Sequence, residues 1–151
     1  MAINTTVSGK ILENYLTICL SERTLIQYKI FKTMSKEEQT SKNFLVQNYP
    51  YKSPTSKRAR VEYYDVRTKT AIECKFQDVQ GTAKQKLVYA GTSLVKQDFN
   101  SIIVYEGKEF TNEFINHCKN VTSAYSKSNN IDINKVRFMS LNEFENLGIN
   151  I

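Results

Sequence analysis

The chain of 151 residues is poor in the residues that interrupt regular structure, because it has only five glycines and two prolines. With 40% hydrophobic and 24% charged residues, this scarcity is typical of a folded protein and excludes a disordered tail. No apolar run approaches the roughly 18–20 residues that cross a bilayer, and no export signal is expected at the N-terminus. The sequence therefore predicts one compact domain over residues 1–151, in the cytoplasm.

Residues that bind zinc or activate nucleophiles are also scarce. The three cysteines are Cys19, Cys74 and Cys118, the only histidine is His117, and no CxxC or CxxH spacing occurs. We therefore expect reduced core thiols and no zinc site. The absence of a Walker loop, a GxGxxG motif and a GxSxG motif leaves nucleotide-driven and serine-hydrolase chemistry without support.

Acidic residues are outnumbered by basic ones, 15 against 21, which gives a net charge of +6 and a pI near 9.2. A positive field of this kind raises the local concentration of polyanions such as DNA or RNA. General surface charge explains the excess equally well until the lysines and arginines can be placed.

The hydrophobic pattern predicts an α/β fold, in which a mixed central β-sheet is flanked by helices. Helical spacing covers residues 8–20, 81–96, 109–125 and 141–147, with Ser8 and Thr82 placed as N-caps and Gly91 as a weak point. Strand-like runs cover residues 24–31, 59–66, 70–77, 101–105 and 136–140. Residues 34–57 contain both prolines and predict a long surface loop, with a helical turn near residues 35–39.

One strand carries polar side chains that suggest chemistry. Alternation along residues 72–77 puts Glu73, Lys75 and Gln77 on one face and apolar side chains on the other. A carboxylate, an ammonium and an amide side by side need either solvent or a ligand. The plain alternative is a half-exposed strand with a solvated Glu–Lys pair.

Hairpin geometry adds a second carboxylate to this face. A two-residue turn at Arg67 and Thr68 puts Glu62 opposite Glu73, whereas a three-residue loop brings Asp65 there instead. Like charges directly opposite each other are unfavourable unless a divalent cation or a nearby ammonium compensates them. The second acidic residue is thus a question of register, and we favour Glu62.

Several segments resemble, in order, the motifs of the PD-(D/E)XK nuclease superfamily, which includes many restriction enzymes and Holliday-junction resolvases. Arg60-Val61-Glu62 is similar to the strand that usually supplies an aspartate, and Ile72-Glu73-Cys74-Lys75-Phe76-Gln77 matches the ExK strand. The other matching segments are the opening helix with Glu13, the start of the next helix at residues 80–83, and the strand at residues 101–105. The resemblance covers about residues 8–105, and it departs from the family where Glu62 replaces the usual aspartate.

This resemblance implies an αβββαβ core and hydrolysis of DNA phosphodiester bonds by water activated on Mg²⁺ or Mn²⁺. The implied metal ligands are Glu62, Glu73 and the main-chain carbonyl of Cys74, while Glu13 holds a metal-bound water or a second ion. Lys75 would orient or help to deprotonate the water and neutralise the charge of the transition state. Gln77 would bond the scissile phosphate or a ligand.

Basic residues near these motifs are expected to contact the DNA backbone. They are Lys57, Arg58 and Arg60 before the hairpin, and Lys84 and Lys86 after it, together with Thr82 at a helix N-terminus. Ordinary solvated charges, and an ordinary cap at Thr82, explain the same residues.

Other functions stay open at this point. The runner-up is a catalytically inactive nucleic-acid-binding module on the same fold, followed by an RNA-directed nuclease or a protein-interaction domain. No membrane contact is expected. A homodimer is a further expectation, because cutting both strands of a duplex needs two sites.

Overall fold

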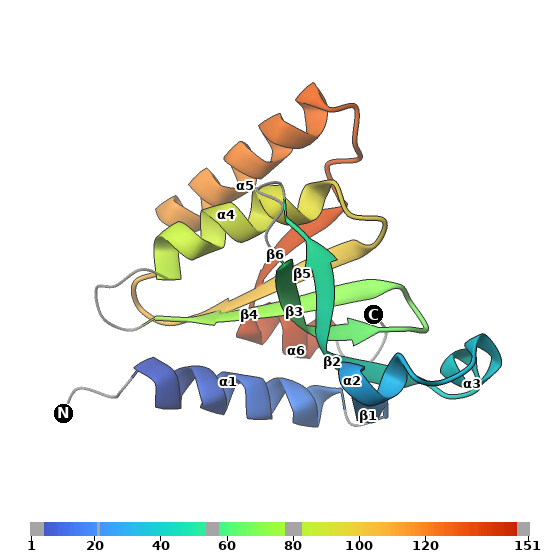
Figure 1. Cartoon of the computed structure of the whole chain (residues 1–151). Coiled ribbons are helices and arrows are strands. Elements are labelled where there is room, and N and C mark those ends of the chain that lie inside the picture. Colours follow the sequence, from blue (N-terminus) through green and yellow to red (C-terminus); the bar gives the residue numbers. More distant parts are fainter. Residues whose placement is uncertain (1–4, 21, 54–57, 78–82, 148–151) are drawn as a thin grey trace.

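The computed structural model describes residues 5–20, 22–53, 58–77 and 83–147, which form one six-stranded sheet with helices on both sides (Figure 1). The helices are α1 (Thr5–Cys19), α2 (Tyr28–Phe31), α3 (Lys36–Thr40), α4 (Ala83–Val95), α5 (Asn112–Ser128) and α6 (Leu141–Leu147). The strands are β1 (Thr24–Gln27), β2 (Phe44–Lys52), β3 (Arg58–Asp65), β4 (Thr70–Phe76), β5 (Asn100–Glu106) and β6 (Val136–Ser140). Among the described helices, none has the length and apolar character needed to cross a membrane.

The strands lie in the sheet in their order along the chain. Strands β2, β3 and β4 are antiparallel neighbours, whereas β1 is parallel to β2, and β4, β5 and β6 are parallel to one another. The parallel strands are joined through helices, as parallel connections require. The predicted mixed sheet flanked by helices is therefore confirmed.

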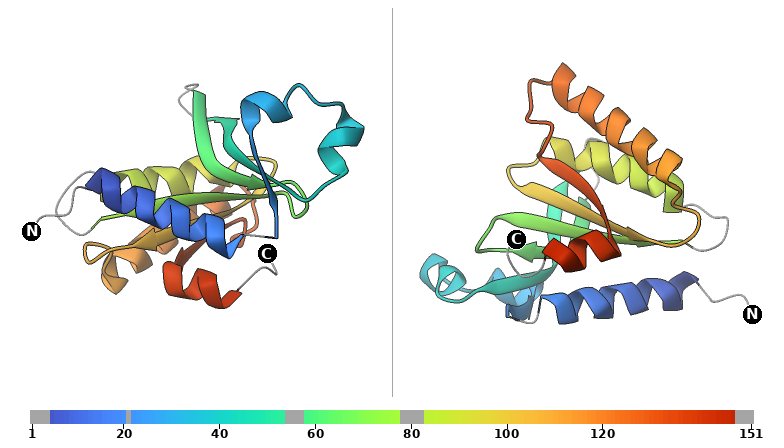
Figure 2. Two further views of the ribbon diagram at one scale, coloured as in Figure 1. Left: turned by 90° about the horizontal axis from the view of Figure 1, so that it is seen from below. Right: turned by 180° about the vertical axis from the view of Figure 1, so that it is seen from behind.

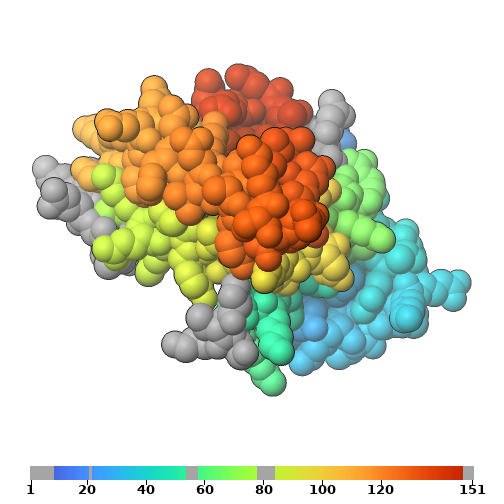
Figure 3. Space-filling view, turned by 90° about the horizontal axis from the view of Figure 1, so that it is seen from above, coloured from blue at the N-terminus to red at the C-terminus, as the bar shows by residue number. Residues whose placement is uncertain are grey.

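Helices cover both faces of the sheet (Figures 1 and 2), and each face has its own apolar core. On one face, helices α1 and α6 pack onto the sheet through residues such as Leu16, Phe144 and Ile72. On the other face, α4 and α5 pack around residues such as Leu87 and Ile103. Seen from above, the side chains of α4 and α5 cover much of this second face (Figure 3). The hairpin β3–β4 lies between the two cores.

The expected loop over residues 34–57 is wrong in its second half, because β2 occupies Phe44–Lys52. Pro50 and the polar composition of this segment are typical of a loop, so the strand was not predicted. A proline is tolerated there because β1 pairs with β2 only from Phe44 to Gln47, so Pro50 has a strand neighbour on one side only. The predicted helical turn is confirmed as α3, which opens with a capping box between Ser35 and Glu38.

Two smaller expectations at the N-terminal end also need correction. The strand expected over residues 24–31 ends at Gln27, and the chain then turns into α2. Helical spacing puts Tyr28 and Phe31 on one side of α2. There Phe31 joins Phe44 and Val46 in a third apolar cluster, and the half-buried Tyr28 packs against it. Ser8 is not an N-cap, because α1 begins at Thr5. Thr82 lies outside the described residues.

Candidate functional site

The register of the β3–β4 hairpin is the one favoured by the sequence. Pairing runs through Asp65–Thr70, Tyr64–Ala71 and Tyr63–Ile72. Continued by one residue, this register places Glu62 opposite Glu73, and the charge of Glu73 acts on the Glu62 carboxyl. The turn spans residues 66–69 instead of two residues, but an even change in loop length leaves the side chains on the same faces.

Strand β3 rotates about its axis at Glu62. Val61 and Tyr63 alternate along the strand and should share a face, yet Val61 packs in the α4–α5 core and Tyr63 in the α1–α6 core. Strand β2 is irregular at the same level, because Asn48 has a positive φ of 57° and the pairing skips from Gln47–Tyr63 to Tyr49–Val61. Glu62 therefore lies at a local break in the sheet.

Because of this rotation, Glu62 is not confined to the face of Glu73 as the alternation predicted. Its carboxylate accepts a hydrogen bond from the Cys74 thiol, whose side chain belongs to the α1–α6 core. Burial raises the pKa of this thiol well above its usual range, and the charges of Glu62 and Glu73 add to the effect. Cys74 is thus a protonated hydrogen-bond donor and not a thiolate nucleophile.

Glu62 is held in an environment that disfavours its charged form. Burial raises the pKa of its carboxyl to about 8, and the charges of Glu73 and Glu13 act in the same direction. The ammonium of Lys75 and the hydrogen bond from Cys74 oppose the shift only in part. Within the described part of the chain, its Oε2 atom is buried and has no hydrogen-bond partner.

Glu73 and Lys75 form an ion pair along the same strand. Glu73 is 9% exposed, and the Lys75 side chain is 20% exposed, so both groups lie at the bottom of the site. Burial acts to lower the pKa of Lys75, but the carboxylates of Glu73 and Glu62 outweigh it and raise the pKa. Lys75 therefore stays protonated at neutral pH, beside two acidic groups.

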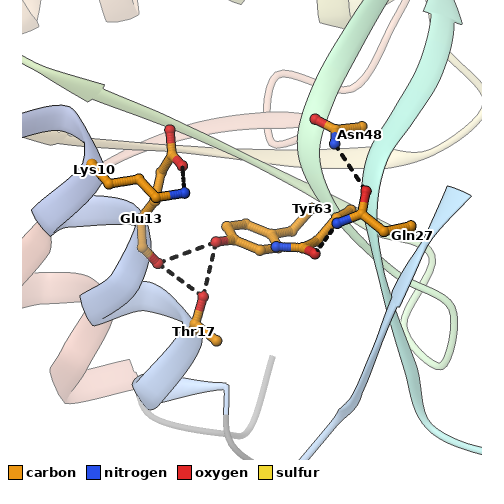
Figure 4. Close-up of polar contacts among 7 residues, drawn as sticks. Lys10, Glu13, Thr17, Gln27, Asn48 and Tyr63 are labelled. Carbon is orange, nitrogen blue, oxygen red and sulfur yellow. Dashed lines mark hydrogen bonds and ion pairs between the residues drawn. The ribbon is translucent and has the colours of Figure 1, made fainter. Parts of the chain in front are cut away.

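Helix α1 carries Glu13, whose main chain lies next to the Tyr63 side chain of β3 (Figure 4). Its main-chain carbonyl accepts hydrogen bonds from the hydroxyl of Tyr63 at 3.1 Å and from that of Thr17 at 3.0 Å. These contacts fix α1 against β3, because the two hydroxyls also lie 2.9 Å apart. The Glu13 carboxylate pairs loosely with Lys10 at 3.8 Å and is close enough to Glu62 to raise its pKa. The sequence did not indicate this docking role of Tyr63.

Gln77 is fixed by the turn that follows β5. It is 2% exposed, its backbone N–H donates to Glu106 O at 3.0 Å, and its carbonyl accepts from Glu109 N at 3.2 Å. Gly107 makes this close approach feasible, since its φ is +122° and a Cβ atom there would lie 2.1 Å from the Gln77 carbonyl oxygen. No motif in the sequence indicated this contact.

Asp65 has a different partner and lies away from the Glu62–Glu73 pair. Its Oδ2 accepts from Arg23 Nε at 2.9 Å, with side chains 0% and 1% exposed, and its Oδ1 accepts from Arg67 N at 3.0 Å. Both oxygens are engaged by the fold. The geometry thus favours Glu62 over Asp65 as the second acidic group of the site.

The donor set of the site fits a hard divalent cation better than zinc. It consists of carboxylate oxygens and main-chain carbonyls near Glu62 and Glu73, and Mg²⁺ or Mn²⁺ prefers such ligands. The buried Oε2 of Glu62 is an acceptor that a cation would satisfy. In the described ranges, no three His, Cys, Asp or Glu side chains already form a metal-binding group, so water and carbonyl oxygens would complete the shell.

The basic residues expected to contact DNA fall into separate environments. Arg58 and Arg60 are exposed at the start of β3, next to a hollow beside α2. Lys84 on α4 pairs with Glu109 at 3.6 Å and lies 5.1 Å from the centre of the Phe114 ring, whereas Lys86 is exposed. Lys57 and Thr82 lie outside the described residues.

Comparison with known proteins gives one match. Residues 4–148 match the family described as PD-(D/E)XK nuclease superfamily domain. No curated protein and no solved structure matches the chain.

Proposed function

Because the chain belongs to the PD-(D/E)XK nuclease superfamily, we propose that it is a Mg²⁺- or Mn²⁺-dependent endonuclease that hydrolyses phosphodiester bonds of DNA. The observation that carries this proposal is the buried carboxylate of Glu62, whose Oε2 lacks a hydrogen-bond partner in the described part of the chain. It lies across the hairpin from Glu73, which is itself paired with Lys75. Two acidic groups held together in a poorly solvated place are costly without a cation.

Each side chain of the site has a proposed task. Glu62 and Glu73, with the carbonyl oxygen of Cys74, hold the cation, which when bound polarises the phosphate and activates water. Glu13 lies at the margin of the site, where its carboxylate would hold water beside a bound cation.

Lys75 acts as a fixed positive charge and not as the base. Its pKa is raised by Glu73 and Glu62, so the ammonium persists at neutral pH and neutralises charge on the phosphate oxygens during cleavage. Gln77 is held rigidly by the turn at Gly107, and its side-chain amide is proposed to donate to a phosphate oxygen.

The test is cleavage of supercoiled plasmid and of branched DNA with Mg²⁺ or Mn²⁺. Glu73→Gln and Lys75→Met are each expected to lower the rate at least about 100-fold. The first removes a proposed cation ligand, and the second removes the positive charge proposed to neutralise the phosphate oxygens. Glu37→Gln on α3 and Lys127→Met on α5 are matched controls at exposed positions and should keep the wild-type rate. Undiminished cleavage by both site variants would refute the proposal.

Calorimetric titration with Mn²⁺ distinguishes the alternative, a nucleic-acid-binding module without turnover. Wild-type protein is expected to bind the ion, and Glu73→Gln to bind it far more weakly. Absence of heat with the wild-type protein, together with retained DNA binding, would favour the inactive module.

A further inference from the structure

A hollow of about 730 Å³ lies beside β2, where the sheet loses one strand. Strand β1 ends at Gln27 and the chain turns away as α2, so no strand in the described ranges pairs with β2 on that side from Asn48 onward. Figure 2 shows α2 standing next to the free part of β2 and the start of β3. The positive φ of Asn48, whose side chain donates to Gln27 at 3.1 Å, marks the point where the two strands part (Figure 4).

The lining of this hollow is strongly basic. Among the lining residues that the structure describes, none is acidic and five are exposed cations: Lys29 and Lys32 from α2, Lys52 from β2, and Arg58 and Arg60 from β3. The three elements are separate segments of the chain, and the fold brings their charges around one hollow. Such a concentration of positive charge favours the binding of a polyanion.

Two tyrosines give the hollow aromatic surfaces. Tyr28 and Tyr51 both line the hollow and are half-buried. The ring of Tyr28 packs edge-on against the ring of Tyr49, with 5.5 Å between the ring centres. Aromatic rings interleaved with cations are typical of surfaces that bind unpaired nucleotides, because bases stack on the rings while phosphates meet the cations.

Strand β3 connects the hollow to the proposed site, because Arg60 lines the hollow and Glu62 follows two residues later on the same strand. A strand lying in the hollow would therefore pass toward the proposed cleavage site.

We propose that this basic hollow binds an unpaired segment of a DNA strand and leads it to the Glu73–Lys75 site, so that the preferred substrate carries a single-stranded tail or branch. This inference rests on the proposed function. The volume of the hollow lies in the range of small-ligand pockets, which measure about 300–1,000 Å³. The hollow can therefore hold on the order of one or two unstacked nucleotides but no duplex. An unpaired segment is the form of DNA that can place its bases on Tyr28 and Tyr51.

Fluorescence anisotropy in EDTA tests the proposal without requiring cleavage. The probes are a labelled single strand of about 12 nucleotides and a blunt duplex of the same sequence. Wild-type protein is expected to bind the single strand more tightly, on the order of tenfold. For Lys29→Gln/Lys32→Gln, we expect a loss of about tenfold and a dependence of log K on log salt that is less steep by about 1.4, because two phosphate contacts are removed.

Matched variants separate the hollow from general charge and from folding. Lys119→Gln/Lys127→Gln removes the same charge from α5, which lies away from α2, and should leave binding within about twofold (Figure 1). Tyr51→Leu should weaken single-strand binding on the order of tenfold, while Tyr51→Phe, which keeps the ring, should retain it.

The outcomes distinguish this inference from the proposed activity. Single-strand preference that depends on Lys29, Lys32 and the Tyr51 ring supports the hollow even if plasmid is never cleaved. Equal binding of duplex and single strand, or equal losses in the α2 and α5 variants, overturns it even if Glu73-dependent cleavage is found.

Discussion

Two acidic residues three positions apart on β3 illustrate how surroundings decide the role of a side chain. Asp65 is neutralised by Arg23 in a fully buried ion pair. Glu62 is surrounded by Glu73 and Glu13, and its Oε2 lacks a hydrogen-bond partner in the described residues. The first arrangement stabilises the fold, whereas the second stores unfavourable interactions that a ligand can relieve.

The raised pKa of Glu62 predicts how stability changes with pH in the absence of metal. The folded protein holds this proton up to a pKa of about 8, whereas the unfolded chain releases it near the ordinary pKa of 4.5. The contribution to stability is thus fully present below the unfolded pKa and is lost as pH rises through the folded value. Urea denaturation in EDTA should show the free energy of unfolding falling over this range. Glu62→Gln should flatten the fall, and the exposed control Glu106→Gln should not.

Asp65→Asn tests the structural role of the other carboxylate. We expect a loss of about 3–5 kcal/mol in the free energy of unfolding, because the buried Arg23 loses its counter-charge. Cleavage per folded molecule should stay near the wild-type value. Denaturant unfolding measures the stability, and plasmid cleavage measures the rate. Loss of cleavage without loss of stability would mean that Asp65 belongs to the catalytic site.

Helix α4 shows why a glycine can sit inside a helix. Gly91 lies where α4 meets α5 and β6, and a Cβ atom there would come within 2.6 Å of Thr122 Oγ1 and 2.8 Å of the Phe138 ring. The sequence suggested a weak point in the helix, but the position is a close contact between elements. The cost in helix propensity is offset by tighter packing.

Gly91→Ala and Gly9→Ala form a matched pair of tests. Alanine favours a helix over glycine by about 1 kcal/mol, so Gly9→Ala in α1, where a Cβ atom meets nothing within 4 Å, should stabilise the protein by up to that amount. Gly91→Ala should instead destabilise it by about 1–3 kcal/mol through overpacking. Thermal unfolding of both variants checks the signs. Equal stabilisation by both would mean that α4 and α5 are not tightly packed.

At the scale of the whole molecule, the site lies where two cores and three elements meet. Helix α1 supplies Glu13, β3 supplies Glu62, and β4 supplies Glu73 and Lys75. Cation binding to groups on separate elements would link them in the folded state only, and therefore couples ion binding to global stability.

This coupling predicts that Mn²⁺ raises the melting temperature of the wild-type protein. At 100 times the dissociation constant, a ligand that binds only the folded state adds about 2.7 kcal/mol. The effect should be larger above pH 8 than near neutral pH, because Glu62 must lose its proton before it binds a cation. Thermal unfolding with and without Mn²⁺ measures it, with Glu73→Gln as the variant that should not respond. An unchanged melting temperature at saturating ion would contradict the proposed metal site.

Local patterns were sufficient to predict most elements and the register of the β3–β4 hairpin. Alternation in residues 70–77 and an even-length turn predicted the register that brings Glu62 opposite Glu73. Strand β2 was missed because Pro50 and a polar composition hide a strand that is paired on one side along half its length. The short helix α2 was missed because its β-branched and aromatic residues favour a strand until the third apolar cluster selects the turn.

The sequence alone determined the α/β class, most of the elements and the register that places Glu62 opposite the Glu-x-Lys strand, because each depends on periodicity or spacing within a short segment. Only the tertiary structure decided that Asp65 pairs with Arg23, that Glu62 turns at a break between two strands, and that cations from α2, β2 and β3 share one hollow. These contacts join residues far apart in the chain, and their energies depend on burial and distance, which local patterns do not encode.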